Sequence, residues 1–181
     1  RVLHNLSFID DPTRIFRAIR YEARYGLRLE EHSARLARGT IDMGLVGDLS
    51  SARLRDELVA LLEDPGATGG ILRLGELGVD RAIHQHLRAD SEGAALFERA
   101  RTMRDELGVD IPAWRLGIAS IARGLSSDEA YDWLLRLKLR RRDVDRIAGA
   151  IRVAPLIVER IEAEDLDAAQ VVALADAYAP D

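Results

Sequence analysis

The sequence predicts an all-α fold, a multi-helix array that follows a short extended connector at the N-terminus. Two observations lead to this expectation. Glycine and proline interrupt the 181-residue chain repeatedly, and the segments between them carry apolar residues at helical spacing. Beyond the opening residues, no convincing alternation of apolar and polar residues marks a half-buried strand. A hydrophobic content of 48% is sufficient for a packed core.

The first helix is the best marked element. Asp11 is a favourable N-cap, Pro12 suits the first helical position and Gly26 suits the helix end, so a helix is expected over 12–25. The preceding residues 1–9, RVLHNLSFI, are expected to form the extended connector.

Similar signals mark the later helices. A second helix is expected over 30–43, and a third follows Ser50 and Ser51 and stops at Asp64 and Pro65. Further helices are expected near 67–77, 92–107, 113–123, 128–138, 141–153, 155–163 and 168–178. These elements divide the chain into a neck, a helical body and a helical tail, with expected bounds of 1–65, 66–125 and 126–181.

The composition excludes several classes of function. The chain has no cysteine, which excludes disulfides, thiolate metal sites and cysteine nucleophiles. It also lacks an apolar run of the roughly 20 residues that a membrane span needs, so a cytoplasmic location is expected. A net charge of -5 restricts any polyanion contact to a local patch. His84 and His86 lack the carboxylate-rich surroundings of a metal site, and we expect no metal in this chain.

The first helix carries two contrasting faces. Its apolar face contains Ile15, Phe16, Ile19 and Ala23. Its opposite face is a guanidinium stripe formed by Arg14, Arg17, Arg20 and Arg24. With only Glu22 nearby as an acidic residue on the helix body, these arginines are expected to need an anionic partner or water. A solvated amphipathic helix would have the same pattern.

Asp11 and Arg14 add a more specific chemistry. A carboxylate at the helix start and a guanidinium one turn later can point to the same side. The exocyclic amines of cytosine and adenine can donate to the carboxylate while an adjacent ring nitrogen accepts from the guanidinium. Uracil and guanine present a carbonyl instead and would leave a polar group unpaired. Alternatively, Asp11 only caps the helix and Arg14 forms an exposed ion pair of less than about 1 kcal/mol.

The first 30 residues, RVLHNLSFIDDPTRIFRAIRYEARYGLRLE, resemble the segment that follows the catalytic head in class II tRNA nucleotidyltransferases and bacterial poly(A) polymerases. In that family an acidic-Asp-x-x-Arg element selects the incoming base. The resemblance implies that Asp11 and Arg14 contact the base of ATP or CTP, and that Arg17 and Arg20 orient this element or approach phosphate. Asp10 departs from the Glu that many members carry.

The third expected helix carries a second matching stretch. SSARLRDELVALL is similar to the family's Ser-x-Glu-Arg-Ile-x-x-Glu-Leu segment. Arg53 and Glu57 occupy the matching positions, whereas Ala52 replaces the usual Glu. Arg53 and Glu57 are also an i, i+4 pair that would stabilise any helix.

Basic residues gather again in the tail. Residues 136–152 contain Asp143 and Asp145 beside the cations Arg136, Lys138, Arg140, Arg141, Arg142, Arg146 and Arg152. The family's all-helical body and tail bind the acceptor arm of tRNA, so the resemblance implies that this cluster contacts RNA phosphates. It also fits a hydrated helix end. Trp114 and Trp133 are expected in the core.

The metal-binding Asp-x-Asp element of the family's catalytic head is missing from these residues. We therefore expect the chain to be a fragment whose head, with its bound Mg²⁺, lies upstream, and we expect no catalysis by residues 1–181 alone. The alternative is a free-standing helical interaction module, in which the guanidinium stripe binds an acidic protein surface.

Overall fold

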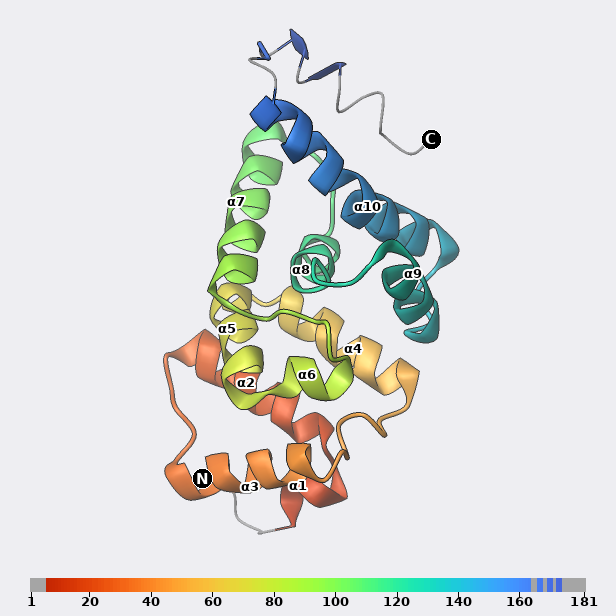
Figure 1. The fold of residues 1–181 in the computed structure, drawn as a ribbon. Coiled ribbons are helices and arrows are strands. Elements are labelled where there is room, and N and C mark those ends of the chain that lie inside the picture. Colours follow the sequence, from red (N-terminus) through yellow and green to blue (C-terminus); the bar gives the residue numbers. More distant parts are fainter. Residues whose placement is uncertain (1–5, 164–165, 168, 171, 174–181) are drawn as a thin grey trace. The chain divides into compact units, whose positions relative to one another are not determined.

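The computed structural model describes residues 6–163, 166–167, 169–170 and 172–173, and the expected helix at 168–178 therefore falls largely outside the described residues. The described part of the chain contains α-helices and no strand, which confirms the all-α prediction (Figure 1). The chain forms two compact units, Arg1–Gly124 and Leu125–Asp181. The finer division into neck, body and tail stays a prediction. No helix in these ranges combines the length and the apolar character that crossing a membrane requires.

The first unit contains eight helices among its described residues: α1 (Ser7–Asp10), α2 (Thr13–Tyr25), α3 (Glu31–Asp42), α4 (Ser51–Leu62), α5 (Ala67–Leu77), α6 (Val79–Ile83), α7 (Ser91–Leu107) and α8 (Ala113–Ile121). Helix α2 packs against α4 and α5, α5 packs against α7, and α8 contacts both α7 and α4. Fully buried aliphatic and aromatic side chains from these helices form one core, including Phe16, Leu58, Leu61, Ile71 and Phe97.

The start of the chain corrects the expectation of an extended connector. Residues Ser7–Asp10 form the helical turn α1, and the described part of the expected connector is thus helical where we predicted extended backbone. Phe8 is 3% exposed, and the backbone N–H of Asp10 donates to the carbonyl oxygen of Leu6 over 2.8 Å. Burial of one aromatic ring and this local hydrogen bond stabilise the turn. Residues 1–5 lie outside the described residues.

Helix α2 follows the predicted pattern closely. Asp11 accepts a hydrogen bond from the backbone N–H of Thr13 over 3.2 Å, and Pro12 immediately precedes the helix. Gly26 ends the helix with φ 63°, a left-handed conformation that favours glycine. Its backbone N–H donates to the backbone carbonyl oxygen of Glu22. Ile15 and Ile19 are fully buried, as the apolar face predicts.

Glu22 is buried rather than lying beside the arginine stripe. Its carboxylate accepts from Nε of Arg73 over 2.8 Å and from Nη2 over 3.2 Å, and the Glu22 side chain is 6% exposed. It also accepts from the backbone N–H of Leu29. These bonds connect α2 to α5 and to the loop after α2. Glu22 therefore neutralises the largely buried Arg73 side chain instead of the arginine stripe.

The backbone at Gly66 lies very close to the backbone of the last turn of α2. A Cβ atom at Gly66 would lie 2.8 Å from the carbonyl carbon of Ala23 and 2.9 Å from the backbone nitrogen of Arg24. Real Cβ atoms are essentially never this close to backbone. Glycine at residue 66 is therefore required for the observed contact between α2 and the turn before α5.

The second unit contains α9 (Ser127–Arg136) and α10 (Arg141–Ala163), which pack against each other. Ser126 and Glu129 form a capping box at the start of α9. Trp133 is 4% exposed and lies in the core, as expected, whereas Trp114 of the first unit is only half-buried.

Helix α10 corrects a predicted boundary. Two helices were expected, over 141–153 and 155–163, because proline cannot donate an intrahelical hydrogen bond. A single helix, Arg141–Ala163, instead continues through Pro155. Ala154, Pro155 and Leu156 are exposed, so water can replace the missing donor there.

Candidate functional site

The Asp11 carboxylate is held by three donors on one oxygen. Oδ1 accepts from the backbone N–H of Thr13 over 3.2 Å, from the Thr13 hydroxyl over 2.7 Å and from Nη2 of Arg53 over 2.6 Å. Partial burial would raise the pKa of Asp11, but the Thr13 hydrogen bonds and the Arg53 charge outweigh it and hold this pKa below its ordinary value. Asp11 is thus ionised at neutral pH with a fixed orientation.

The Arg14 guanidinium lies beside this carboxylate. Its Nε is 3.9 Å from Oδ2 of Asp11, a distance too long for a hydrogen bond but within ion-pair range. Nη1 of Arg14 donates to the hydroxyl of Ser7 over 2.6 Å and to the Ser7 carbonyl oxygen over 3.2 Å. The structure therefore brings the two predicted base-contacting side chains together at the α1–α2 corner.

Arg53 departs from the pairing that the sequence indicates. Its spacing from Glu57 is that of an i, i+4 helix pair, yet its guanidinium bonds Asp11 across the α2–α4 interface. Burial raises the pKa of Glu57, while the charges of Arg20 and Arg17 oppose the shift only in part. The matching Arg and Glu of α4 thus lie next to the first-helix residues that the resemblance singled out.

The arginine stripe is partly neutralised within the chain, contrary to our expectation. Nη2 of Arg24 lies 2.7 Å from the buried Oδ2 of Asp64, and the interaction with this carboxylate raises the pKa of Arg24. Arg24 therefore stabilises the fold of the first unit. Only the earlier part of the stripe remains as a candidate contact for an anion.

Arg17 and Arg20 surround an exposed tyrosine. The Arg20 guanidinium lies 5.6 Å from the centroid of the Tyr21 ring. Hydrogen bonds from Arg17, and next from Arg20, lower the pKa of Tyr21. Arg17 is exposed and Arg20 is half-buried, so both lie within reach of a ligand that approaches α2 beyond Asp11 and Arg14.

The predicted RNA-contacting cluster lies entirely on the surface of the second unit. Its exposed members are Arg136, Lys138, Arg140, Arg141, Arg142, Arg146 and Arg152. Lys138 has φ 55°, a left-handed conformation, at the turn between α9 and α10. Nε of Arg141 donates to Oδ1 of Asp145 over 3.1 Å, and its guanidinium lies 5.1 Å from the Tyr131 ring centroid. The turn thus concentrates cations on a short stretch of surface.

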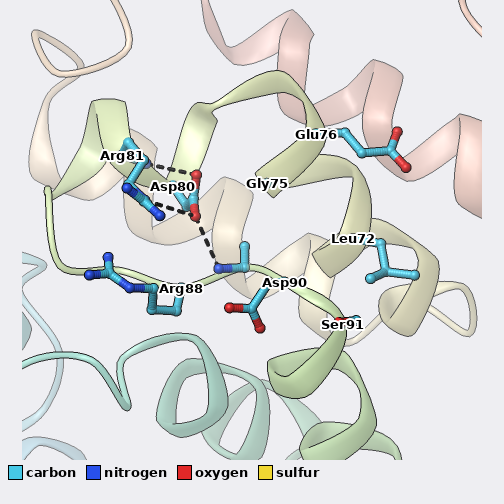
Figure 2. Close-up of a pocket in the computed structure, with 9 residues that line it drawn as sticks. Leu72, Gly75, Glu76, Asp80, Arg81, Arg88, Asp90 and Ser91 are labelled. Carbon is cyan, nitrogen blue, oxygen red and sulfur yellow. Dashed lines mark hydrogen bonds and ion pairs between the residues drawn. The ribbon is translucent and has the colours of Figure 1, made fainter.

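A hollow of about 340 Å³ in the first unit contains charged groups that serve the fold (Figure 2). The Asp80 carboxylate accepts from the backbone N–H groups of Arg81 over 2.8 Å and Ala89 over 3.0 Å. Nη1 of Arg88 donates to the carbonyl oxygens of Gln85 and Leu87, each over 3.0 Å. The bond between Asp80 and Ala89 joins α6 to the segment before α7, and the charged groups of Asp80 and Arg88 are partnered within the fold.

The two neighbouring histidines pack edge to face. The ring centroids of His84 and His86 are 5.6 Å apart. Within the described ranges, no group of three or more His, Cys, Asp or Glu side chains is arranged to hold a metal ion.

The sequence of the chain was compared with protein-family models and with known proteins. No protein-family model matches the chain. Over 87 residues it is 46% identical to an A-adding tRNA nucleotidyltransferase of Geobacter sulfurreducens, a match covering 48% of this chain and 10% of the relative. Over 101 residues it is 36% identical to a CC-adding tRNA nucleotidyltransferase of the same organism, covering 55% and 23%.

Solved structures agree with the sequence matches. A CCA-adding enzyme in its apo form I superposes with a TM-score of 0.80 and 28% identity, over 96% of this chain and 42% of that enzyme. A Thermotoga maritima CCA-adding enzyme complexed with tRNA gives a TM-score of 0.77 and 25% identity, over 100% and 47%. The chain is similar to these tRNA nucleotidyltransferases over part of their length. It spans less than half the length of these tRNA nucleotidyltransferases, and the predicted resemblance is confirmed.

Sequence reasoning missed two contacts at the corner that this resemblance highlights. Ser7 was assigned to an extended connector, and Arg53 was paired with the wrong carboxylate. The family stretch in α4 indicated that Arg53 matters, but only the packing of α4 on α2 shows which group it contacts. No sequence signal identified Ser7.

Proposed function

We propose that residues 1–181 form the base-selecting and tRNA-binding region of a tRNA nucleotidyltransferase that adds C or A to RNA 3′ ends. The arrangement of Asp11 carries the proposal. Three donors occupy Oδ1, and Oδ2 faces the Arg14 guanidinium without a hydrogen bond from the described residues. An acceptor and a set of donors therefore lie side by side, on side chains that are 27% exposed for Asp11 and 48% exposed for Arg14.

Such a pair matches the edges of cytosine and adenine. Oδ2 of Asp11 would accept from the exocyclic amine, and Nε or Nη2 of Arg14 would donate to the adjacent ring nitrogen. Uracil and guanine would place a carbonyl oxygen against Oδ2, and two acceptors without a proton between them repel. In this proposal, Arg17 and Arg20 orient the element or approach phosphate.

The joining reaction is assigned outside this chain. Nucleotidyl transfer needs carboxylates that hold metal ions. The described residues do not supply such a cluster, so in this proposal Mg²⁺ and the triphosphate of ATP or CTP are held by a catalytic head beyond residues 1–181. An enzyme acting on tRNA would work in the cytoplasm.

The second unit is proposed to contact the RNA backbone. Cations without fixed hydrogen-bond geometry suit phosphates, which attract charge irrespective of sequence. The cluster at the α9–α10 turn consists of exposed cations, of which Arg141 also donates to Asp145. Neck, body and tail then correspond to base selection, support and RNA contact.

Titration of the chain with tRNA at two salt concentrations tests the RNA-binding part of the proposal. We expect binding at low salt that weakens steeply as salt rises, because released counterions contribute to the affinity. Binding to an acidic protein without binding to tRNA at low salt would contradict this part and support the alternative of a protein-interaction module.

Base selection is tested in the longer protein that combines this chain with its catalytic head. We expect Arg14→Ala or Asp11→Ala to reduce discrimination against U and G by about tenfold to a hundredfold, measured as nucleotide incorporation into tRNA transcripts. Arg35→Ala is the matched control, because Arg35 also forms an exposed ion pair on a helix, with Glu31 over 2.8 Å. Unchanged discrimination with lowered thermal stability would show that Asp11 only caps α2.

A further inference from the structure

Ser7 makes the hydrogen bonds that hold the Arg14 side chain in place. The Arg14 side chain is 48% exposed, and its Nε lies 3.9 Å from Asp11, so the ion pair alone does not determine where the guanidinium points. The Ser7 hydroxyl and carbonyl oxygen both accept from Nη1, over 2.6 and 3.2 Å. A long side chain with several rotatable bonds is thereby fixed at its tip.

Ser7 itself lies on a firmly held element. Phe8, the next residue, is 3% exposed and anchors α1 in the core of the first unit. The Ser7 carbonyl oxygen also accepts from the backbone N–H of Asp11 over 3.3 Å, so one peptide group contacts both members of the base-contacting pair. The short turn α1 is therefore a support on which Arg14 rests.

Three polar atoms of the Asp11 and Arg14 side chains remain available to a ligand. Nη1 of Arg14 is used by Ser7, and Oδ1 of Asp11 is used by Thr13 and Arg53. Nε and Nη2 of Arg14 and Oδ2 of Asp11 make no hydrogen bond with the described residues, and Nε lies 3.9 Å from Oδ2. We infer that Ser7 is a positioning residue for base selection, which fixes Nη1 of Arg14 so that Nε and Nη2 meet the incoming base beside Oδ2 of Asp11. This inference rests on the proposed function.

The serine hydroxyl is the part of this support that substitution can remove. Ser7→Ala deletes the 2.6 Å hydrogen bond and keeps the carbonyl contact, whereas Ser7→Thr keeps a hydroxyl on the same Cβ. A guanidinium that is free to rotate can offer a donor to the carbonyl oxygen of a wrong base. The loss should therefore appear in base choice.

The test compares incorporation of C, A, U and G into tRNA transcripts by the longer protein, in wild type and in the Ser7→Ala, Ser7→Thr and Arg14→Ala variants. For Ser7→Ala we expect a loss of discrimination against U and G of about threefold to tenfold, smaller than for Arg14→Ala. The loss should appear mainly as a higher KM for the correct nucleotide, and Ser7→Thr should restore wild-type behaviour.

The outcomes separate this inference from the proposed function. If Arg14→Ala relaxes base choice and Ser7→Ala leaves both discrimination and KM unchanged, Ser7 is not a positioning residue, although the base-selecting role of the pair stands. If Arg14→Ala itself leaves base choice unchanged, the proposed function fails first. A Ser7→Ala variant that only lowers Tm, with wild-type discrimination, would show a purely structural role and overturn the inference.

Discussion

The two arginine-rich regions of the molecule differ in what holds their side chains. At the α1–α2 corner, Arg14 donates to Ser7, and Asp11 accepts from Thr13 and Arg53, so hydrogen bonds fix both side chains. At the α9–α10 turn the cations are exposed, and the hydrogen bond between Arg141 and Asp145 joins two residues that are both more than two-fifths exposed. Fixed donors and acceptors suit the discrimination of bases, whereas exposed charges suit the attraction of phosphates. Under the proposed function, the first region would supply selectivity and the second region affinity.

The largest effect should come from removing the anchor of the first region. Glu22→Ala would remove one of the two carboxylates that pair with Arg73, whose side chain is 11% exposed, and would leave only the more exposed Glu76, also 2.8 Å away. We expect a loss of about 3 kcal/mol in the free energy of unfolding, measured by urea denaturation, because removing one partner of a buried ion pair is costly.

Glu31→Ala is the control for that substitution, since Glu31 forms an exposed pair with Arg35. Its expected cost is below about 0.5 kcal/mol. If both variants lost the same free energy of unfolding, the buried pair of Glu22 would stabilise the protein no more than an exposed pair. The first region would then not be held more firmly than the second.

A smaller effect should come from the second region. We expect the double substitution Arg142→Ala and Arg146→Ala to weaken tRNA binding about tenfold at low salt and to reduce the slope of log affinity against log salt by about 2. Base choice should not change, because these side chains are assigned to phosphate contact. Arg35→Ala, an exposed arginine of the first unit, should leave the slope as it is. A double variant with altered base choice and an unchanged salt slope would reverse the proposed division.

The smallest effect concerns the pH dependence of the first region. Because the folded-state pKa of Asp11 is lowered, its contribution to stability is complete above the unfolded-state pKa and is lost as pH falls through the folded-state value. Arg53→Ala should move the pKa of Asp11 upward, observed by NMR titration of its carboxyl carbon. Asp90 is an internal reference, since its pKa is lowered by Gly93 and Arg123 instead. If the pKa of Asp11 did not change in Arg53→Ala, Thr13 alone would orient the carboxylate.

Local signals in the sequence predicted most of the helical framework. Gly26 at a helix end and Ser126 before an acidic first turn act through neighbouring backbone, so their effects are encoded within a few residues. The same reasoning failed at Pro155, because exposure decides whether a helix tolerates a missing donor and exposure is a property of the folded chain. It also failed at Ser7, where burial of Phe8 stabilises a turn too short to leave a periodic pattern.

The site was only half predictable for the same reason. Asp11 and Arg14 are one helical turn apart, and their proximity follows from helix geometry. The contact of Arg53 with Asp11 joins positions 42 residues apart, and that of Glu22 with Arg73 joins positions 51 residues apart. Such partners depend on how helices pack. Charge pattern alone indicated only that Glu22 is an acidic residue near the arginine stripe, and the spacing of Arg53 indicated a partner in its own helix.

The contact between Gly66 and the last turn of α2 links a distant position to the placement of Asp11 and Arg14. Because the opposing atoms at Ala23 and Arg24 belong to backbone, a methyl group at residue 66 can be accommodated only if α2 or the turn moves. A helix moves largely as a rigid rod, so displacement at its end is transmitted to Asp11 and Arg14 at its start. Under the proposed function, substitution of residue 66 would therefore change nucleotide preference by displacing α2, while the side chains of Asp11 and Arg14 stay the same.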